Sequence, residues 1–297
     1  MNTAKNTETF LEHYFADQPA CSGTSNRRML GVFLDAGCGD GTFLDDLLTL
    51  ADAQEVWGLD VDEDALSDAR LFMNRAGIHF RYRIASSLNS GLPACFFNTI
   101  SFRDLLHHLA GGSFSHEPPL RARRLIRRHF REMDRLLRPG GRFIISECIV
   151  DDDPPPARAA AIMLHNLKSE IDTRHGINHS YSFCARTLRT LLANILTERG
   201  YTIEACAVVN EAEAHAEDNA DDAAAADADA DGQARCNYFS ASLARLADAP
   251  GCSEFLHEAR QRLLNIQAAI HRHGLLPQRR LMLIARKSSD ISIANRQ

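Results

Sequence analysis

The sequence lacks several features that would assign it to a special class of protein. Its 8 cysteines include no pair in the C-x-x-C spacing, so neither a structural zinc site nor a redox pair is predicted. No uninterrupted apolar run is long enough to span a membrane, and residues 1–30 lack the charged-then-apolar pattern of a signal peptide. We therefore expect a cytoplasmic protein with no metal site and no membrane partner.

An excess of positive charge is also missing. The formal net charge is -6 at pH 7, so the chain as a whole is not expected to attract nucleic acid. Its 297 residues, of which 45% are hydrophobic, are enough for one large domain or for one domain with insertions.

The most informative stretch that is present runs from Val32 to Leu44. An apolar segment predicts a short buried strand, and Gly37, Gly39 and Gly41 follow it at alternate positions before a helical pattern. Glycines let the backbone turn tightly and approach a ligand, and the free N–H groups of the helix start point at that ligand. The pattern favours a ligand-binding loop, and the alternative is a tight turn that binds nothing.

The spacing of this loop distinguishes between cofactors. A dinucleotide site prefers G-x-G-x-x-G/A, but Thr42 stands where the third small residue would be, which disfavours an NAD-dependent dehydrogenase. An apolar strand then ends in Asp60, about 20 residues beyond the loop, where an acid can bind both ribose hydroxyls of a nucleotide. Asp60 is the candidate, and Asp62 remains an alternative that could instead cap the following helix.

Together the loop and the acid resemble class I S-adenosylmethionine-dependent methyltransferases, whose first motif is an acidic residue followed by G-x-G-x-G. The resemblance implies that S-adenosyl-L-methionine is the cofactor. It also implies that Asp35 helps to hold the methionine portion, that Gly37, Gly39 and Gly41 line that portion, and that Asp60 binds ribose. Val61, beside Asp60, is a further candidate cofactor contact.

The order of the predicted elements indicates an α/β fold. Strands are expected at about 31–36, 55–60, 79–84, 98–102 and 201–209, and helices at about 42–51, 63–76, 119–138, 185–199 and 253–273. Alternation of strand and helix predicts a parallel sheet covered on both faces. Pro139 to Gly141 are similar to the family's Leu-x-Pro-Gly-Gly turn. The resemblance implies a Rossmann-like doubly wound sheet of seven strands, mostly parallel with an antiparallel last strand at 281–286, plus helical insertions.

This order suggests a division of the chain into four parts. We expect an N-terminal helix or lid at 1–29, a methyltransferase core at 30–209 with a substrate-side insertion at 151–184, an acidic low-complexity linker at 210–237, and C-terminal helices with the final core strand at 238–297. The N-terminal helix could lie over the cofactor through Tyr14 and Phe15, or pack on the domain surface.

Other candidate site residues rest on weaker patterns. Ser86 and Ser87 occupy the places where the family usually has an acid or amide that contacts adenine, and Asn98 replaces an acid of the family's Phe-Asp pair. The strand that ends near Arg103 and Asp104 should place both toward cofactor or substrate, because ligands bind at the carboxyl ends of strands in doubly wound sheets. The candidate catalytic or substrate-contacting residues are His107, His108, His179 and Tyr181, and Glu147, at the far end of its strand, could also reach the active site.

The expected activity is methyl transfer from S-adenosylmethionine to a small molecule. One alternative is an RNA or protein methyltransferase that uses the basic face of the helix carrying Arg121 to Arg138, although exposed aromatic residues for base stacking are missing there. Another is a non-catalytic S-adenosylmethionine-binding or assembly protein. Nucleic acid is not the expected partner, and the C-terminal helices are candidate contacts for a homo-oligomer.

Overall fold

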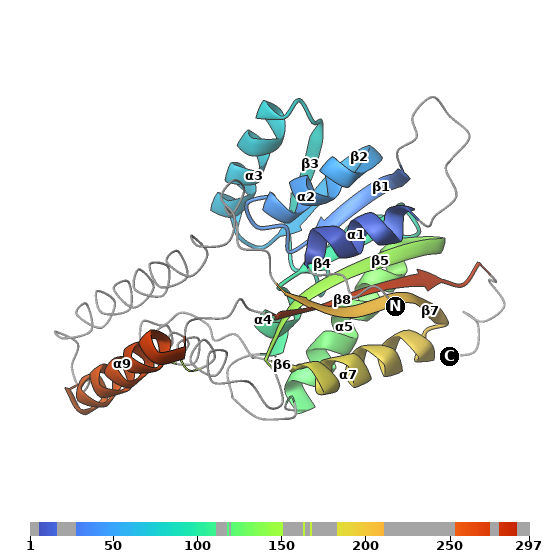
Figure 1. Cartoon of the computed structure of the whole chain (residues 1–297). Helices are drawn as coiled ribbons and strands as arrows, with labels where there is room; N and C mark the ends of the chain where they lie inside the picture. Colours follow the sequence, from blue (N-terminus) through green and yellow to red (C-terminus); the bar gives the residue numbers. More distant parts are fainter. Residues whose placement is uncertain are drawn as a thin grey trace.

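One mixed sheet runs through the computed structural model (Figure 1). The structure describes residues 6–16, 28–110, 118, 120–150, 163, 167, 183–210, 253–273 and 279–289. The predicted linker at 210–237, apart from Asn210, and most of the predicted insertion at 151–184 lie outside these residues.

The described elements follow the predicted order closely. They are α1 (Thr7–Ala16), β1 (Arg28–Ala36), α2 (Thr42–Leu50), β2 (Ala51–Asp60), α3 (Glu63–Arg75), β3 (Phe80–Ile84), β4 (Phe97–Arg103), α4 (Leu106–Ala110), α5 (Leu120–Leu136), β5 (Leu137–Val150), β6 (Phe183–Cys184), α7 (Ala185–Glu198), β7 (Tyr201–Asn210), α9 (Ser253–His273) and β8 (Arg279–Lys287). The short helix α4 and the short strand β6 were not predicted. None of the described helices is long and apolar enough to cross a membrane.

The topology confirms the predicted fold class. The strand order is β3-β2-β1-β4-β5-β8-β7, and β6 pairs with β5 outside this path. Strands β1 to β5 pair in parallel, whereas β8 lies antiparallel to both β5 and β7. The carboxyl ends of β1, β2, β4 and β5 therefore meet at one edge of the sheet. The glycine loop, which follows β1, lies at this edge.

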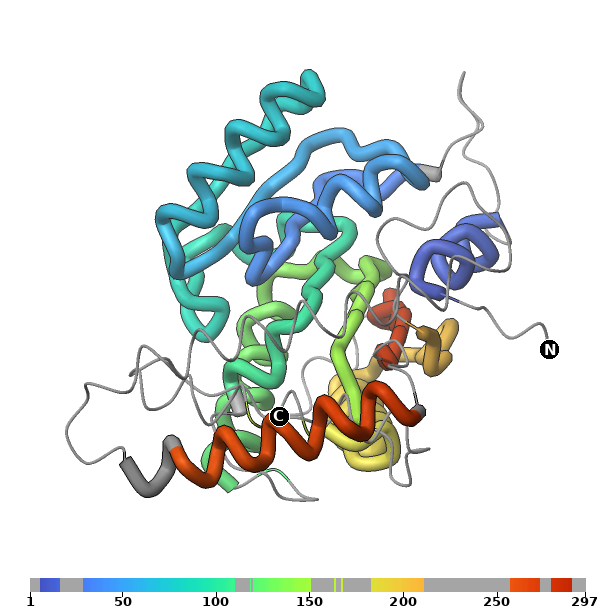
Figure 2. The backbone as a smooth tube through the Cα atoms, turned by 60° about the vertical axis from the view of Figure 1, so that its left-hand side comes forward, coloured from blue at the N-terminus to red at the C-terminus, as the bar shows by residue number. Residues whose placement is uncertain are grey.

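Helices cover both faces of the sheet, as Figures 1 and 2 show from two directions. Successive side chains of a strand point to opposite faces, and β1 illustrates the result. Phe33 packs with Phe43 of α2 in one buried cluster, while Leu34 packs with Phe130 of α5 in the other. Helices α1, α2 and α3 lie over the first cluster, and α5 and α7 lie over the second.

The residues of the predicted Pro-Gly-Gly turn form a bulge in the pairing of β4 with the start of β5. Phe97 pairs with Leu137 and Thr99 pairs with Arg142, so the four residues between Leu137 and Arg142 stand opposite Asn98 alone. Gly140 has a φ of 74°, which an L-residue adopts only with strain. Asn98 has a structural part here, because its Oδ1 accepts a hydrogen bond from the backbone N–H of Val32 at 3.0 Å.

Helix α1 packs against β7, β8 and α2. Tyr14 and Phe15 are both buried in this packing. The hydroxyl of Tyr14 donates to Glu204 of β7 at 2.5 Å, and Arg142 donates to the same hydroxyl at 3.2 Å. In this position the two aromatic side chains hold α1 to the sheet, and a role as a cofactor lid stays a prediction.

Candidate functional site

The glycine loop after β1 is fixed by its own backbone hydrogen bonds. The N–H groups of Gly37 and Cys38 both donate to the carbonyl of Leu59, at 2.6 and 3.3 Å, and Gly41 donates to the carbonyl of Cys38 at 2.9 Å. The first two bonds join the end of β1 to the end of β2. The loop is therefore pre-formed against the strand that carries Asp60.

The carboxylate of Asp60 completes this arrangement. One oxygen accepts from the N–H of Gly39 at 2.9 Å, and the other accepts from the N–H groups of Val61 at 2.7 Å and Asp62 at 3.0 Å. Asp62 has a different part, because its side chain accepts from Asp64 and Ala65 as the N-cap of α3. Of the two acids left open by the sequence, Asp60 faces the loop and Asp62 caps a helix.

The three loop glycines differ in what surrounds them. A Cβ on Gly37 would lie 2.9 Å from Leu105, and one on Gly41 would lie 3.3 Å from Ala69 and Met73. A Cβ on Gly39 would meet nothing within 4 Å. The backbone of Gly39 therefore borders open space, and this is where a ligand can approach the loop.

Asp35 lies under this loop at the end of β1 and is 1% exposed. Burial raises its pKa to about 6, although the hydrogen bond from Ser101 and the charge of Arg103 act to lower it. The Ser101 hydroxyl donates to the carboxylate at 2.6 Å. Asp35 thus gains or loses its proton near neutral pH, and a cationic ligand group beside it would favour the charged form.

The predicted adenine side of the site lies next to Asp60. The N–H of Ala85 donates to the Asp60 carbonyl at 2.9 Å, which brings the loop after β3 alongside β2. Within that loop Ser86 accepts a hydrogen bond from the N–H of Leu88 at 3.2 Å, and Ser87 is buried. Val61 is 69% exposed, so it offers an uncovered apolar surface beside the Asp60 carboxylate.

Arg103 ends β4 and reaches toward α2. Its guanidinium carbon lies 5.4 Å from the centre of the Phe43 ring, and its side chain is 3.4 Å from a carboxylate oxygen of Asp46. It is also 3.5 Å from the carboxylate of Asp104. Arg103 therefore lies at the predicted edge of the sheet, beside the first turn of the helix that follows the glycine loop.

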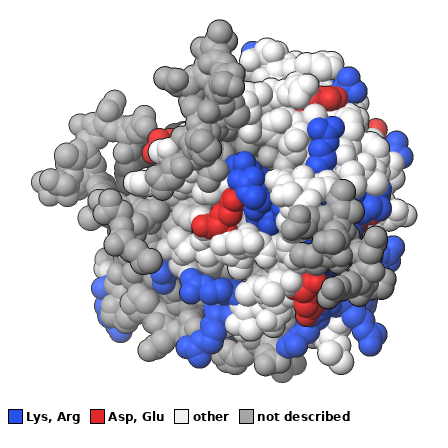
Figure 3. Space-filling model, turned by 90° about the vertical axis from the view of Figure 1, so that its right-hand side faces the viewer, with Lys and Arg blue, Asp and Glu red and all other residues white. Residues whose placement is uncertain are grey.

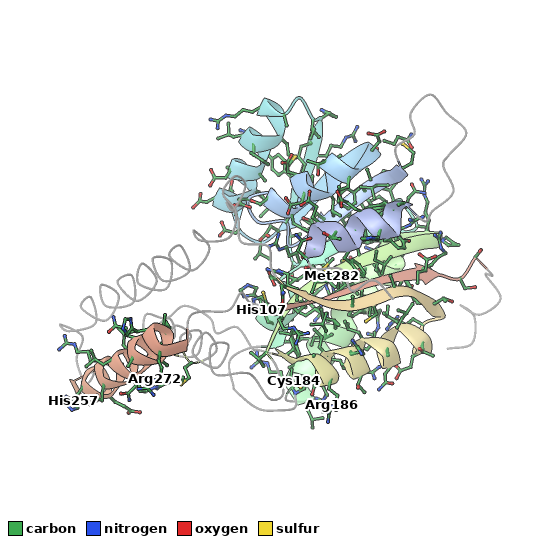
Figure 4. All side chains as sticks on the ribbon, viewed as in Figure 1. His107, Cys184, Arg186, His257, Arg272 and Met282 are labelled. Carbon is green, nitrogen blue, oxygen red and sulfur yellow. The ribbon has the colours of Figure 1, made fainter. Side chains whose placement is uncertain are left out.

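A second cluster of polar groups lies where β4 and β5 end. The ring of His107 binds one carboxylate oxygen of Glu147 through Nδ1, and the N–H of Leu106 donates to the other oxygen at 2.8 Å. The Glu147 side chain is fully buried, and that of His107 is 15% exposed. His108 is exposed, with its ring centre 4.2 Å from that of His107. Figure 4 labels His107 at this end of the sheet.

A buried arginine from β8 joins the same cluster. Arg280 donates to both carboxylate oxygens of Asp104, at 2.9 and 2.7 Å, and the N–H of Cys148 donates to one of them at 3.1 Å. Although burial alone would raise it, the bonds and charge of Arg280 lower the pKa of Asp104 to about 2. Asp104 is therefore ionised and already paired with a cation.

The pKa values of His107 and Glu147 both depend on the contact between the two side chains. Burial raises the pKa of Glu147, against the charge and hydrogen bond of His107. Burial alone would lower the pKa of His107, but the charge and hydrogen bond of Glu147 outweigh it and raise that pKa above its usual 6.5. Donor atoms of Asp104, His107 and Glu147 lie within 4.8 Å of one another. Since Arg280 already supplies the positive charge there, we do not assign these residues to a metal.

Several predicted site residues are brought together and others cannot be placed. Asp35, the loop glycines, Asp60, Arg103 and His107 share the edge where the parallel strands end. His179 and Tyr181 lie outside the described residues. Two residues were missed, Ser101 beneath Asp35 and Arg280 beside Asp104. Ser101 lies on an apolar strand and Arg280 lies far along the chain, so no local pattern marked either one.

Comparisons with known proteins agree with this geometry. Residues 34–145 match the family model described as a methyltransferase domain. No curated protein matches the chain.

Among solved structures, a putative methyltransferase from Bacillus halodurans C-125 has a TM-score of 0.55 at 13% identity, covering 95% of this chain and 99% of that one. The cyclase SpnF has a TM-score of 0.50 at 14% identity, covering 94% and 81%. At these identities the solved structures show the fold alone. The family model thus identifies residues 34–145, fewer than half of the chain, as similar to a methyltransferase domain.

Proposed function

We propose that this protein transfers the methyl group of S-adenosylmethionine to a small-molecule acceptor. The observation that carries the proposal is the Asp60–Gly39 hydrogen bond at 2.9 Å, which places a carboxylate beside the one loop glycine that borders open space. An acid at this position suits the two hydroxyls of a ribose. The exposed Val61 suits the flat face of an adenine, and the buried Asp35 suits the ammonium of the methionine portion.

The chain has a limited task in such a reaction. The sulfonium of the donor is already activated, so catalysis consists mainly in placing an acceptor atom in line with the methyl group and keeping water away. The loop held by Leu59 and Asp60 fixes the donor side. The groups at the ends of β4 and β5 lie where an acceptor would meet it.

A macromolecular acceptor has less support. Of the arginines on α5, Arg127 is paired with Glu198 of α7 and Arg135 with Glu132, so part of the basic face serves the fold. The face drawn in Figure 3 has acidic side chains among its basic ones. Fold likeness alone does not fix the reaction, since a cyclase is among the similar structures.

The test is calorimetric titration of the purified protein with S-adenosylmethionine, comparing Asp60→Ala with Asp62→Ala. The two acids are neighbours of equal charge, but only Asp60 faces the loop. We expect binding to weaken at least about tenfold in Asp60→Ala, or about 1.4 kcal/mol, and to change less than about twofold in Asp62→Ala. Equal losses in both variants, or no binding by the folded wild type, would contradict the proposal.

A further inference from the structure

We propose that His107, held by Glu147, is the general base of the reaction, and that the acceptor is therefore a hydroxyl compound that loses its proton as it is methylated. This inference rests on the proposed methyl transfer and adds to it the catalytic residue and the class of acceptor. It also chooses between His107 and His108, which the sequence alone left equivalent.

The orientation of the His107 ring gives the first argument. Nδ1 is bound to the buried carboxylate of Glu147, so this nitrogen carries a proton in the neutral ring and Nε2 carries the free electron pair. Among the described residues no hydrogen bond occupies Nε2. Glu147 is fully buried and the His107 side chain is 15% exposed, so the ring is anchored through Nδ1 and keeps part of its surface accessible.

The second argument is the position of the pair. Leu105 packs against Gly37 of the glycine loop, so that a Cβ on Gly37 would lie 2.9 Å from it. The next residue, Leu106, donates its N–H to Glu147, and His107 follows directly. The base is thus two residues from a direct contact with the cofactor loop, at the edge of the sheet where ligands bind in folds of this kind.

The charges around the ring are consistent with proton transfer. Among the described residues, four groups face His107: Glu147 from β5, Asp104 from the end of β4, Arg280 from β8 and His108 from its own helix. Arg280 donates a hydrogen bond to each carboxylate oxygen of Asp104. With that pair neutralised, Glu147 is the counter-charge for a protonated His107, and it stabilises the imidazolium that forms when the ring accepts a proton.

The chemical step is balanced without another reactant. The O–H bond of the acceptor breaks and its proton moves to Nε2 of His107, while the oxygen forms a bond to the methyl carbon. The bond between that carbon and sulfur breaks, and its electron pair stays on sulfur. The products are a methyl ether and S-adenosylhomocysteine, and His107 then releases the proton to water. A neutral amine attacks through its lone pair before it loses a proton, whereas a hydroxyl is a weak nucleophile until a base removes its proton, so this arrangement favours a hydroxyl.

The experiment compares wild type with His107→Gln, with the neighbouring His108→Gln as the matched control, and with Glu147→Gln. Each protein is titrated with S-adenosylmethionine by calorimetry, and then incubated with labelled donor and a small-molecule cell extract. Labelled products are sorted by mass spectrometry into methyl ethers, methylamines and thioethers. Rates are followed from about pH 6 to about pH 9, because a base must be deprotonated to act.

We expect methyl ethers from wild type and a rate lower by about 100-fold or more in His107→Gln, with cofactor affinity changed less than about twofold in that variant. His108→Gln should lower the rate much less than His107→Gln does. In wild type the rate should rise with pH as His107 loses its proton, and Glu147→Gln should move this rise to lower pH, because the carboxylate that favours the charged ring is gone. A residue with a merely structural role would not move the pH profile.

Other outcomes overturn the inference. Labelled methylamines or thioethers in place of ethers, or no labelled product, would exclude the acceptor class. An equal loss in His108→Gln, or full activity in His107→Gln, would exclude His107 as the base. Activity that disappears with a chelator and returns with Mg²⁺ would assign the cluster to a metal. Failure of the wild type to bind the cofactor would instead refute the proposed function, and this titration is read separately.

Discussion

Arg280 binds both carboxylate oxygens of Asp104, and this bond joins β8 to the end of β4 across a separation of 176 residues. Asp104 itself has a φ of 52°, a conformation that costs an L-residue free energy. The arginine therefore fixes a strained residue at the edge of the candidate site. Because its positive charge offsets the negative charge of Asp104, Arg280 also opposes the effect of Asp104 on the pKa of His107.

Removing this arginine should destabilise the protein. For Arg280→Met we expect a loss of about 2–3 kcal/mol in the free energy of unfolding, below the about 3–5 kcal/mol of a fully buried ion pair, because the Asp104 side chain keeps 30% exposure. The measurement is urea unfolding of wild type, Arg280→Met, Asp104→Asn and the double variant. The double variant should lose less than the sum of the single losses, and strict additivity would show that the pair contributes nothing.

Asp35 should make stability fall as pH rises. Its folded pKa is about 6, raised by burial from 3.8, so between about pH 4 and pH 6 the folded state holds a proton that the unfolded state has lost. Replacing it with Asn keeps an acceptor for Ser101. At pH 7 Asp35→Asn should be more stable than wild type by about 2–3 kcal/mol, and at pH 4 about equally stable.

The same substitution should weaken cofactor binding, and wild-type affinity should itself fall below about pH 6 as Asp35 gains its proton. Thermal unfolding and calorimetric titration over this pH range check both statements. A stability difference between the two proteins that does not change with pH would contradict the assignment.

His129 should act on stability in the opposite direction. The ring is buried beside Phe102 and Phe130. Neither ring nitrogen has a hydrogen-bond partner among the described residues. The nearby backbone of Ser87 acts to raise the pKa of the ring, but burial has the larger effect. Burial lowers its pKa to about 3. The unfolded state therefore binds a proton that the folded state does not, and stability falls as pH decreases from about 6.5 toward 3.

A Phe at this position keeps the ring and removes two unpaired polar atoms. We expect His129→Phe to gain about 1–2 kcal/mol at neutral pH and to lose less stability in acid than wild type does. Urea unfolding at several pH values measures both effects, with the exposed His79→Phe as the control. Equal acid sensitivity of wild type and His129→Phe would refute this account.

A comparison of Gly41→Ala with Gly77→Ala should separate the free-energy cost of backbone strain from that of a steric contact. Both have a positive φ, 86° and 73°, but a Cβ on Gly41 would touch Ala69 and Met73, whereas one on Gly77 would meet nothing within 4 Å. Gly77→Ala should cost about 1 kcal/mol from strain alone. Gly41→Ala should cost about 2–3 kcal/mol, because strain and displacement of α3 add. Chemical denaturation gives both values, and equal losses would show that the contact with α3 relaxes freely.

The fold could be predicted largely because its signals are local. Helix α3 was expected at about 63–76 and is found at Glu63–Arg75, since Asp62 caps its start and Gly77 follows its end. The cofactor half of the candidate site was equally readable, because Asp35, the glycines and Asp60 all come from two consecutive strands and their loops.

The rest of the candidate site depends on contacts between distant residues. His107 and His108 look alike in the sequence, and only the carboxylate of Glu147, which lies 40 residues further on, distinguishes them. Asn98 looked like a substituted site acid, yet it bonds to the backbone of β1. No periodicity or spacing reports such pairs, because they arise from the order of strands in the sheet.

That strand order also has a consequence for the nascent chain. Strand β8 is inserted between β5 and β7, and among the described strands β7 pairs with β8 alone. While the ribosome is still making residues 211–278, the edges of β5 and β7 that later pair with β8 have no partner among the described strands. Contacts of such long sequence separation form slowly, and exposed edges invite association with other chains. Completion of the sheet therefore waits for the last strand, and we expect the unfinished protein to depend on chaperones during this interval.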